Sequence, residues 1–113
     1  MGCLAQNSDT TPEVVKPGLT RRVVTLDSIM TVVVDFTGGP WKIADPLHFH
    51  PHEQTSYIAE GEIILYSEGE TDEHLVAGDV FYIPSGKKHG IKLLTPTARL
   101  IDSFSPIRED FLK

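Results

Sequence analysis

Three of the five histidines of this chain lie within five positions, in the segment HFHPH at residues 48–52. In an extended strand, side chains two positions apart point to the same face, so we expect His48 and His50 to project together. Pro51 interrupts this alternation, so the pattern does not fix the side taken by His52. Two imidazoles on one face supply half of a tetrahedral or octahedral metal site, and the remaining ligands must come from other segments.

Two stretches of the chain share a spacing with known motifs. The first reads His-x-His, three residues, Gln, six residues, Gly, at His48, His50, Gln54 and Gly61. The second reads Gly, five residues, Pro-x-Gly, two residues, His, at Gly78, Pro84, Gly86 and His89. Both resemble the signature motifs of the cupin superfamily, whose fold is a small β-barrel with jelly-roll connectivity.

The resemblance implies one divalent metal ion inside the barrel, bound by four side chains: His48, His50, Gln54 and His89. Gln54 stands where the family usually has glutamate, and Leu93 stands where it has asparagine. Glu53 is an alternative ligand, but alternation puts it on the face opposite an inward Gln54. The metal's identity stays open among nickel, zinc, iron and manganese, because all four accept imidazole-rich sites.

The glutamine changes the expected chemistry of the ion. Three neutral imidazoles and an amide leave the double charge of the metal uncompensated, which makes a stronger Lewis acid that attracts anionic ligands. The alternative is that Gln54 only hydrogen-bonds inside a barrel that has no metal.

The segment ARLIDSFSPIRED carries a second cluster of polar residues. Asp102 alternates with Leu100 and Phe104, and an inward aspartate is costly to bury without a partner or a role. Arg108 follows a Ser-Pro break, can fold back over the barrel mouth, and has a fork of donors that suits a carboxylate. The alternatives are an ion pair of Asp102 with Arg99 or Arg108, and a solvated Arg108.

A narrower resemblance covers three segments: HFHPHEQTSYIAEGE, GDVFYIPSGKKHGIK and DSFSPIREDFL. Together they are similar to the pectin-degradation cupins, which convert 4,5-unsaturated uronates released by polysaccharide lyases to open-chain 5-keto-4-deoxyuronate. The resemblance implies that Asp102 moves protons, Arg108 holds the sugar carboxylate and Phe104 forms an apolar wall. Two alternative functions are a non-catalytic cupin that binds a sugar acid or another small anion, and a cupin dioxygenase.

The elements that position these residues are predicted to be short strands. Runs rich in β-branched and aromatic residues alternate with turn residues, which indicates an antiparallel sandwich or barrel and an all-β fold. The expected strands are residues 21–27, 29–37, 55–60, 62–67, 73–77, 79–84, 89–94 and 98–104. REDFLK is the one candidate for a helical turn. We expect a flexible tail or an edge strand over 1–18 and a single cupin domain over 19–113.

Composition limits the partners. A chain of 113 residues with a net charge of -6 suits one domain and argues against nucleic-acid or anionic-membrane partners, which require a basic surface. A small anion in a local cationic pocket remains compatible with that charge. The single cysteine, Cys3, allows no disulfide within the chain, and no segment resembles a signal peptide or membrane span, so we expect a cytoplasmic protein. The cupin resemblance also implies a homodimer formed through edge strands.

Overall fold

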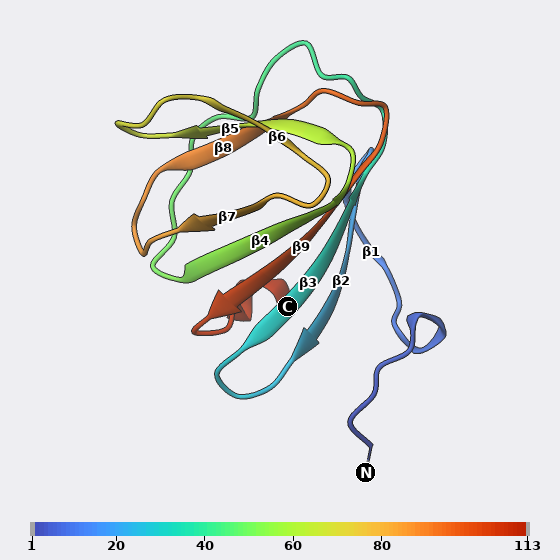
Figure 1. The fold of residues 1–113 in the computed structure, drawn as a ribbon. Coiled ribbons are helices and arrows are strands. Elements are labelled where there is room, and N and C mark those ends of the chain that lie inside the picture. Colours follow the sequence, from blue (N-terminus) through green and yellow to red (C-terminus); the bar gives the residue numbers. More distant parts are fainter. Residues whose placement is uncertain (1, 113) are drawn as a thin grey trace.

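The computed structural model describes residues 2–112, and nine β-strands and two short 3-10 helices account for its regular elements (Figure 1). The strands are β1 (Glu13–Lys16), β2 (Leu19–Thr25), β3 (Met30–Phe36), β4 (Glu53–Glu60), β5 (Glu62–Ser67), β6 (Glu73–Val76), β7 (Val80–Ile83), β8 (His89–Leu93) and β9 (Ala98–Ser105). The helices are η1 (Asn7–Asp9) and η2 (Glu109–Leu112). The predicted all-β fold is confirmed, and no helix within residues 2–112 is long and apolar enough to cross a membrane.

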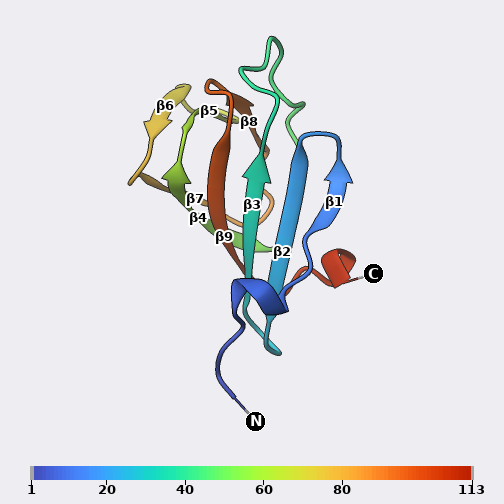
Figure 2. The ribbon, with the colours of Figure 1, turned by 90° about the vertical axis from the view of Figure 1, so that its right-hand side faces the viewer.

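The strands form two antiparallel sheets. The larger sheet has the order β1-β2-β3-β9-β4-β7, and the smaller has the order β6-β5-β8. Figures 1 and 2 show the last long strand, β9, inserted between β3 and β4 of the larger sheet, so that chain segments far apart in sequence lie side by side. β1 lies at the edge of this sheet and pairs with β2. It falls within residues 1–18, for which the sequence allowed either a flexible tail or an edge strand.

Alternation along the strands sorts side chains between the barrel interior and the surface. In β4, Gln54, Ser56 and Ile58 are buried, whereas Glu53 and Tyr57 are exposed. This is the period of two expected for a strand with one buried face. Gln54 is therefore turned inward and Glu53 outward, as alternation predicted.

The barrel interior has an apolar part and a polar part. Burial of apolar surface is the main force that closes the two sheets on each other. The main apolar cluster consists of Phe36, Ile58, Ile63, Leu65, Phe81, Ile83, Leu93, Ala98 and Leu100. A smaller cluster of Met30, Val32 and Phe104 lies under the C-terminal segment, where Ile107 and Phe111 pack on it. The C-terminal segment thus covers one region of the barrel interior.

The structure corrects one local expectation, the strand through HFHPH. His48 forms an isolated bridge with His89, and residues 49–52 lie outside any strand. The proline at 51 has no N–H to donate and so cannot continue a hydrogen-bonded ladder. The two backbone bonds between His48 and His89, each 2.9 Å, fix the segment instead.

Candidate metal centre

Three histidines from two segments converge at one place: His48 and His50 from the HFHPH segment, and His89 from β8. The ring nitrogens available from His48, His50 and His89 all lie within 4.8 Å of one another. The ring of His89 lies 4.4 Å from that of His48 and 5.0 Å from that of His50, measured between centroids. The isolated bridge brings His48 to β8, and the chain then turns so that His50 is buried while His48 stays exposed.

Two of the histidines are oriented by backbone carbonyls. Nδ1 of His50 lies 3.0 Å from the carbonyl oxygen of His52, and Nδ1 of His89 lies 2.8 Å from that of Lys87. A carbonyl oxygen only accepts hydrogen bonds, so each Nδ1 must carry the proton. In a neutral ring the Nε2 atom is then left with its lone pair, which is the form that binds a metal.

The environment keeps these rings neutral. Burial lowers the pKa of His50 below its ordinary value of 6.5, and burial lowers the pKa of His89 to about 4. The charge of Arg108 acts in the same direction on both groups. Near neutral pH the two imidazoles therefore present lone pairs, as metal ligands must.

Gln54 completes the donor set. Its Oε1 lies 3.1 Å from Nε2 of His50, while its Nε2 donates to the Ser56 hydroxyl at 2.9 Å. When the His50 proton is on Nδ1, the Gln54 Oε1 atom faces the lone pair of His50 Nε2, and neither atom can donate a hydrogen bond to the other. A cation bound by both atoms would stabilise this arrangement. Three imidazoles and one amide oxygen are a donor set that divalent first-row metals accept, so the residues present fit such an ion.

Asp102 lies on the inner face of β9 near this donor set. In the sheet register it stands opposite Val32 on one side and Ser56 on the other. Its Oδ1 is shielded from solvent and has no hydrogen-bond partner among the described residues. Burial raises the pKa of Asp102 from 3.8 to about 6, and the nearby Ser56 hydroxyl and the charge of Arg108 oppose that shift.

The ion pairs offered as alternatives for Asp102 are absent from residues 2–112. Arg99 is paired with Asp35, with Nε 2.7 Å from Oδ1. Arg108 is paired with Asp110, with Nη2 2.9 Å from Oδ2 and Nε 3.3 Å from Oδ1. The Asp102 carboxyl thus has a shielded Oδ1 and no salt-bridge partner among the residues that the structure describes.

Arg108 folds back over the barrel interior, as the sequence suggested. Its side chain is only 17% exposed, and Cζ lies 5.3 Å from the centroid of the Phe104 ring. Phe104 is buried, and its ring lies 5.8 Å from that of His50. The hydrogen bonds from Arg108 also lower the pKa of Asp110. Phe104 and Arg108, two of the residues singled out in the sequence, therefore lie close to the histidines.

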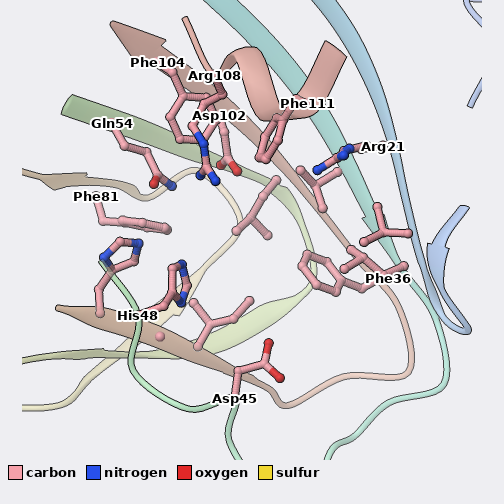
Figure 3. A pocket seen from close by; sticks show the side chains of 17 residues that line it. Arg21, Phe36, Asp45, His48, Gln54, Phe81, Asp102, Phe104, Arg108 and Phe111 are labelled. Atoms are coloured by element: carbon pink, nitrogen blue, oxygen red, sulfur yellow. The ribbon is translucent and has the colours of Figure 1, made fainter. Parts of the chain in front are cut away.

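One cavity of about 190 Å³ is lined both by proposed metal ligands and by the residues singled out in β9 and the C-terminal segment (Figure 3). Its walls include most of the residues proposed from the sequence: His48, Gln54, His89, Asp102, Phe104 and Arg108. Figure 3 shows Gln54, Asp102 and Arg108 directed toward one another across this cavity. The cavity therefore offers a divalent-metal donor set, a buried carboxyl and a guanidinium to one small ligand.

Sequence reasoning missed three residues of this region: Ser56, Arg21 and Phe111. Ser56 follows Gln54 by two positions, so strand alternation would have placed both on the inner face. Arg21 and Phe111 both line the cavity. Neither is marked by a local motif, because β2 and η2 reach the cavity only through the three-dimensional arrangement of the barrel.

Comparison with known proteins agrees with this geometry. Residues 36–103 match the model of the cupin domain family. The chain is 37% identical over 106 residues to the pectin degradation protein KdgF of Dickeya dadantii (strain 3937), covering 92% of this chain and 94% of that protein.

Solved structures give the same relationship. KdgF from Halomonas sp. superposes with a TM-score of 0.82 at 33% identity, over 94% of this chain and 96% of that one. An RmlC-like cupin from Shewanella frigidimarina NCIMB 400 superposes with a TM-score of 0.85 at 34% identity, over 98% of this chain and 96% of that one. These similarities extend over nearly the whole chain.

Proposed function

The chain belongs to the cupin family and, within it, to the small pectin-degradation cupins, and from this we propose that it opens 4,5-unsaturated monouronates to 5-keto-4-deoxyuronate. The observation that carries the proposal is Asp102, whose solvent-shielded carboxyl has no ion-pair partner in the described chain and lines the same cavity as His48, His89 and Gln54. Such a carboxyl is suited to moving a proton on a ligand held beside a metal.

The dimensions and charge of the cavity support a small acidic substrate. About 190 Å³ is small beside the ~300–1,000 Å³ typical of sites for drug-sized ligands, which favours a single sugar ring over a chain of rings. Arg108 adds positive charge to a pocket of an otherwise acidic protein. Electrostatic attraction of this kind favours an anionic monosaccharide over a neutral one.

His48, His50, Gln54 and His89 would hold the divalent ion. When bound, the ion supplies Lewis acidity toward the oxygens of an anionic sugar. The protein's part is to keep the imidazoles neutral and oriented through the carbonyls of His52 and Lys87.

Asp102 is proposed to carry the proton in both halves of the reaction. As a carboxylate it accepts the proton of the anomeric hydroxyl, the O–H electrons form the aldehyde C=O, and the ring C–O bond breaks to leave an enolate. The resulting carboxylic acid then gives the proton to the alkene carbon, and the enolate becomes a ketone. No atom is gained or lost. A pKa of about 6 suits a group that must both accept and donate near neutral pH.

Phe104 and Arg108 are proposed to align the sugar. The buried Phe104 ring offers an apolar surface next to the histidines and limits water around the enolate. Arg108 brings positive charge to the same place, although Asp110 occupies part of its guanidinium. Phe104 belongs to β9, and Arg108 belongs to the C-terminal segment that packs over it.

The proposal is tested by mixing the metal-loaded protein with unsaturated galacturonate and following the loss of the double-bond absorbance. We expect loss that is faster than in buffer and that slows after removal of the metal. A rate equal to that of buffer would contradict the proposal. Binding of the sugar acid without turnover would then support the non-catalytic alternative, and oxygen consumption with a candidate substrate would support the dioxygenase.

A further inference from the structure

One edge of the Arg108 guanidinium is already occupied. Nε and Nη2, the two nitrogens along one edge of the guanidinium, both donate to the carboxylate of Asp110. A bidentate bond to a carboxylate uses two parallel N–H groups of one edge. Three N–H groups of Arg108, two on Nη1 and one on Nη2, are left for a ligand, but its Nε edge cannot bind a sugar carboxylate while it holds Asp110.

A second guanidinium lines the same cavity. Arg21 stands opposite Val34 in the register of β2 and β3, and both residues line the cavity. Its side chain is 17% exposed. Its Nε donates to Glu13 of β1, and this is its only hydrogen bond within the described residues. The edge formed by Nη1 and Nη2 is therefore available to a ligand.

Phe111 holds the two arginines apart. Cζ of Arg21 lies 3.9 Å from the centroid of the Phe111 ring, and Cζ of Arg108 lies 4.2 Å from it. Figure 3 shows Phe111 between the two side chains, with Arg21 directed toward the cavity. Stacking on an aromatic ring restrains a guanidinium and leaves its edges free for hydrogen bonds.

We infer that Arg21 is a substrate-binding residue whose free Nη edge receives the carboxylate of a sugar acid. The inference rests on the proposed function for its substrate class. It adds a second guanidinium to the site: Arg21 receives the acid group, and Arg108 has its Nη1 and Nη2 groups for other oxygens of the sugar. A neutral sugar of the same size leaves the Arg21 edge unpaired and binds less tightly.

The test measures binding rather than turnover. Galacturonate has the carboxylate but lacks the double bond, and galactose is its neutral counterpart. Dissociation constants of both sugars are measured by calorimetry on the metal-loaded protein. We expect Arg21→Gln to weaken galacturonate binding by about tenfold or more and to leave galactose binding within about twofold. Arg21→Lys, which keeps the charge without the planar edge, should lie between Arg21→Gln and the unchanged protein.

Two matched controls separate this role from charge and folding. Arg22 is the next residue of β2, points away from Arg21 and bonds to Asn7, so Arg22→Gln removes the same charge outside the cavity. Glu13→Gln removes the negative charge beside Arg21 without removing its guanidinium. We expect both variants to bind galacturonate within about threefold of the unchanged protein.

Three results would overturn the inference. They are an Arg21→Gln variant that binds galacturonate as well as the unchanged protein, an equal loss in Arg22→Gln or Glu13→Gln, and an unchanged protein that prefers galactose or binds both sugars equally. Arg21-dependent binding without turnover of unsaturated galacturonate would instead contradict the ring-opening proposal and retain this one. Melting temperatures of all variants identify a loss that comes from unfolding.

Discussion

Ser56 of β4 lies directly opposite Asp102 of β9 in the larger sheet, and the Ser56 hydroxyl accepts a hydrogen bond from the Gln54 amide at 2.9 Å. One hydroxyl thus stands between a proposed metal ligand and the proposed proton carrier. The contact with Ser56 favours the charged form of Asp102, while burial opposes it.

Asp102→Asn is expected to abolish most of the activity. The amide has nearly the shape of the carboxyl but cannot accept or return the proton, and general acid–base catalysis typically contributes ~10²–10⁴-fold to a rate. Initial rates with unsaturated galacturonate should therefore fall by about that factor while bound metal, measured by elemental analysis, stays unchanged. A fall of less than about tenfold would show that Asp102 is not the proton carrier.

The same substitution is expected to stabilise the metal-free protein near neutral pH. The pKa of Asp102 is about 6 in the folded protein, against an ordinary value of 3.8. At a pH between these two pKa values, Asp102 is ionised in the unfolded chain but protonated in the folded protein. The natural protein therefore loses stability relative to Asp102→Asn as the pH rises from about 4 to about 6. The advantage of the variant should grow between pH 4 and pH 7 by up to about 3 kcal/mol.

Urea unfolding with a chelator present, at both pH values, measures this difference. If the difference in unfolding free energy between Asp102→Asn and the natural protein does not change with pH, Asp102 is no harder to ionise in the folded protein than in the unfolded chain. Taken with the rates, an increase in stability and a loss of activity in one variant would identify a carboxyl retained for chemistry at a cost in stability.

The strands and the family could be predicted from the sequence because both depend on local patterns. Runs of β-branched residues between turn residues gave β2 to β9 close to their observed bounds, and the two spaced motifs were enough to identify a cupin. Alternation along β4 and β9 correctly put Gln54 and Asp102 on inner faces. These inferences needed only the period of two of a strand.

Long-range arrangement was beyond the same reasoning. His48 is positioned by a bridge to His89, forty-one positions later, rather than by a strand of its own. Arg21 and Phe111 meet because β2 and η2 reach the same region, which no local pattern encodes. The domain boundary at residue 19, the homodimer, the cytoplasmic location and the catalytic roles stay predictions.

The glycine that ends β4 is predicted to be required for the fold. Gly61 has a φ of 87°, and a Cβ added there would lie 2.6 Å from both Cβ of Ala98 and the carbonyl oxygen of Thr97. Gly61→Ala should lower the free energy of unfolding by about 2–5 kcal/mol, since left-handed strain and overpacking add.

Gly69→Ala is the matched control. Gly69 has a similar φ of 78°, and no atom lies within 4 Å of an added Cβ. Its substitution should therefore cost only the backbone strain, about 1–2 kcal/mol. Both losses of unfolding free energy are measured from urea midpoints at constant slope. Equal losses would show that Thr97 and Ala98 move away from the added Cβ at no cost in free energy.

Gln54→Glu restores the residue usual in the family and is expected to separate metal affinity from turnover. A carboxylate neutralises part of the charge of a bound ion, so the metal should bind more tightly in competition with a chelator. The same neutralisation weakens the Lewis acid, and the new negative charge near Ser56 disfavours ionisation of Asp102. Turnover should fall by about tenfold, a change of ~1.4 kcal/mol in the barrier.

The neighbouring residue supplies the control for that experiment. Glu53 is exposed on the outer face of β4, so Glu53→Gln makes the opposite change one position away and outside the cavity. It should leave both metal affinity and turnover within about twofold, since exposed charges are screened. If Glu53→Gln lost the metal while Gln54→Glu did not alter its affinity, the ion would be bound through Glu53, and the proposed ligand set would be wrong.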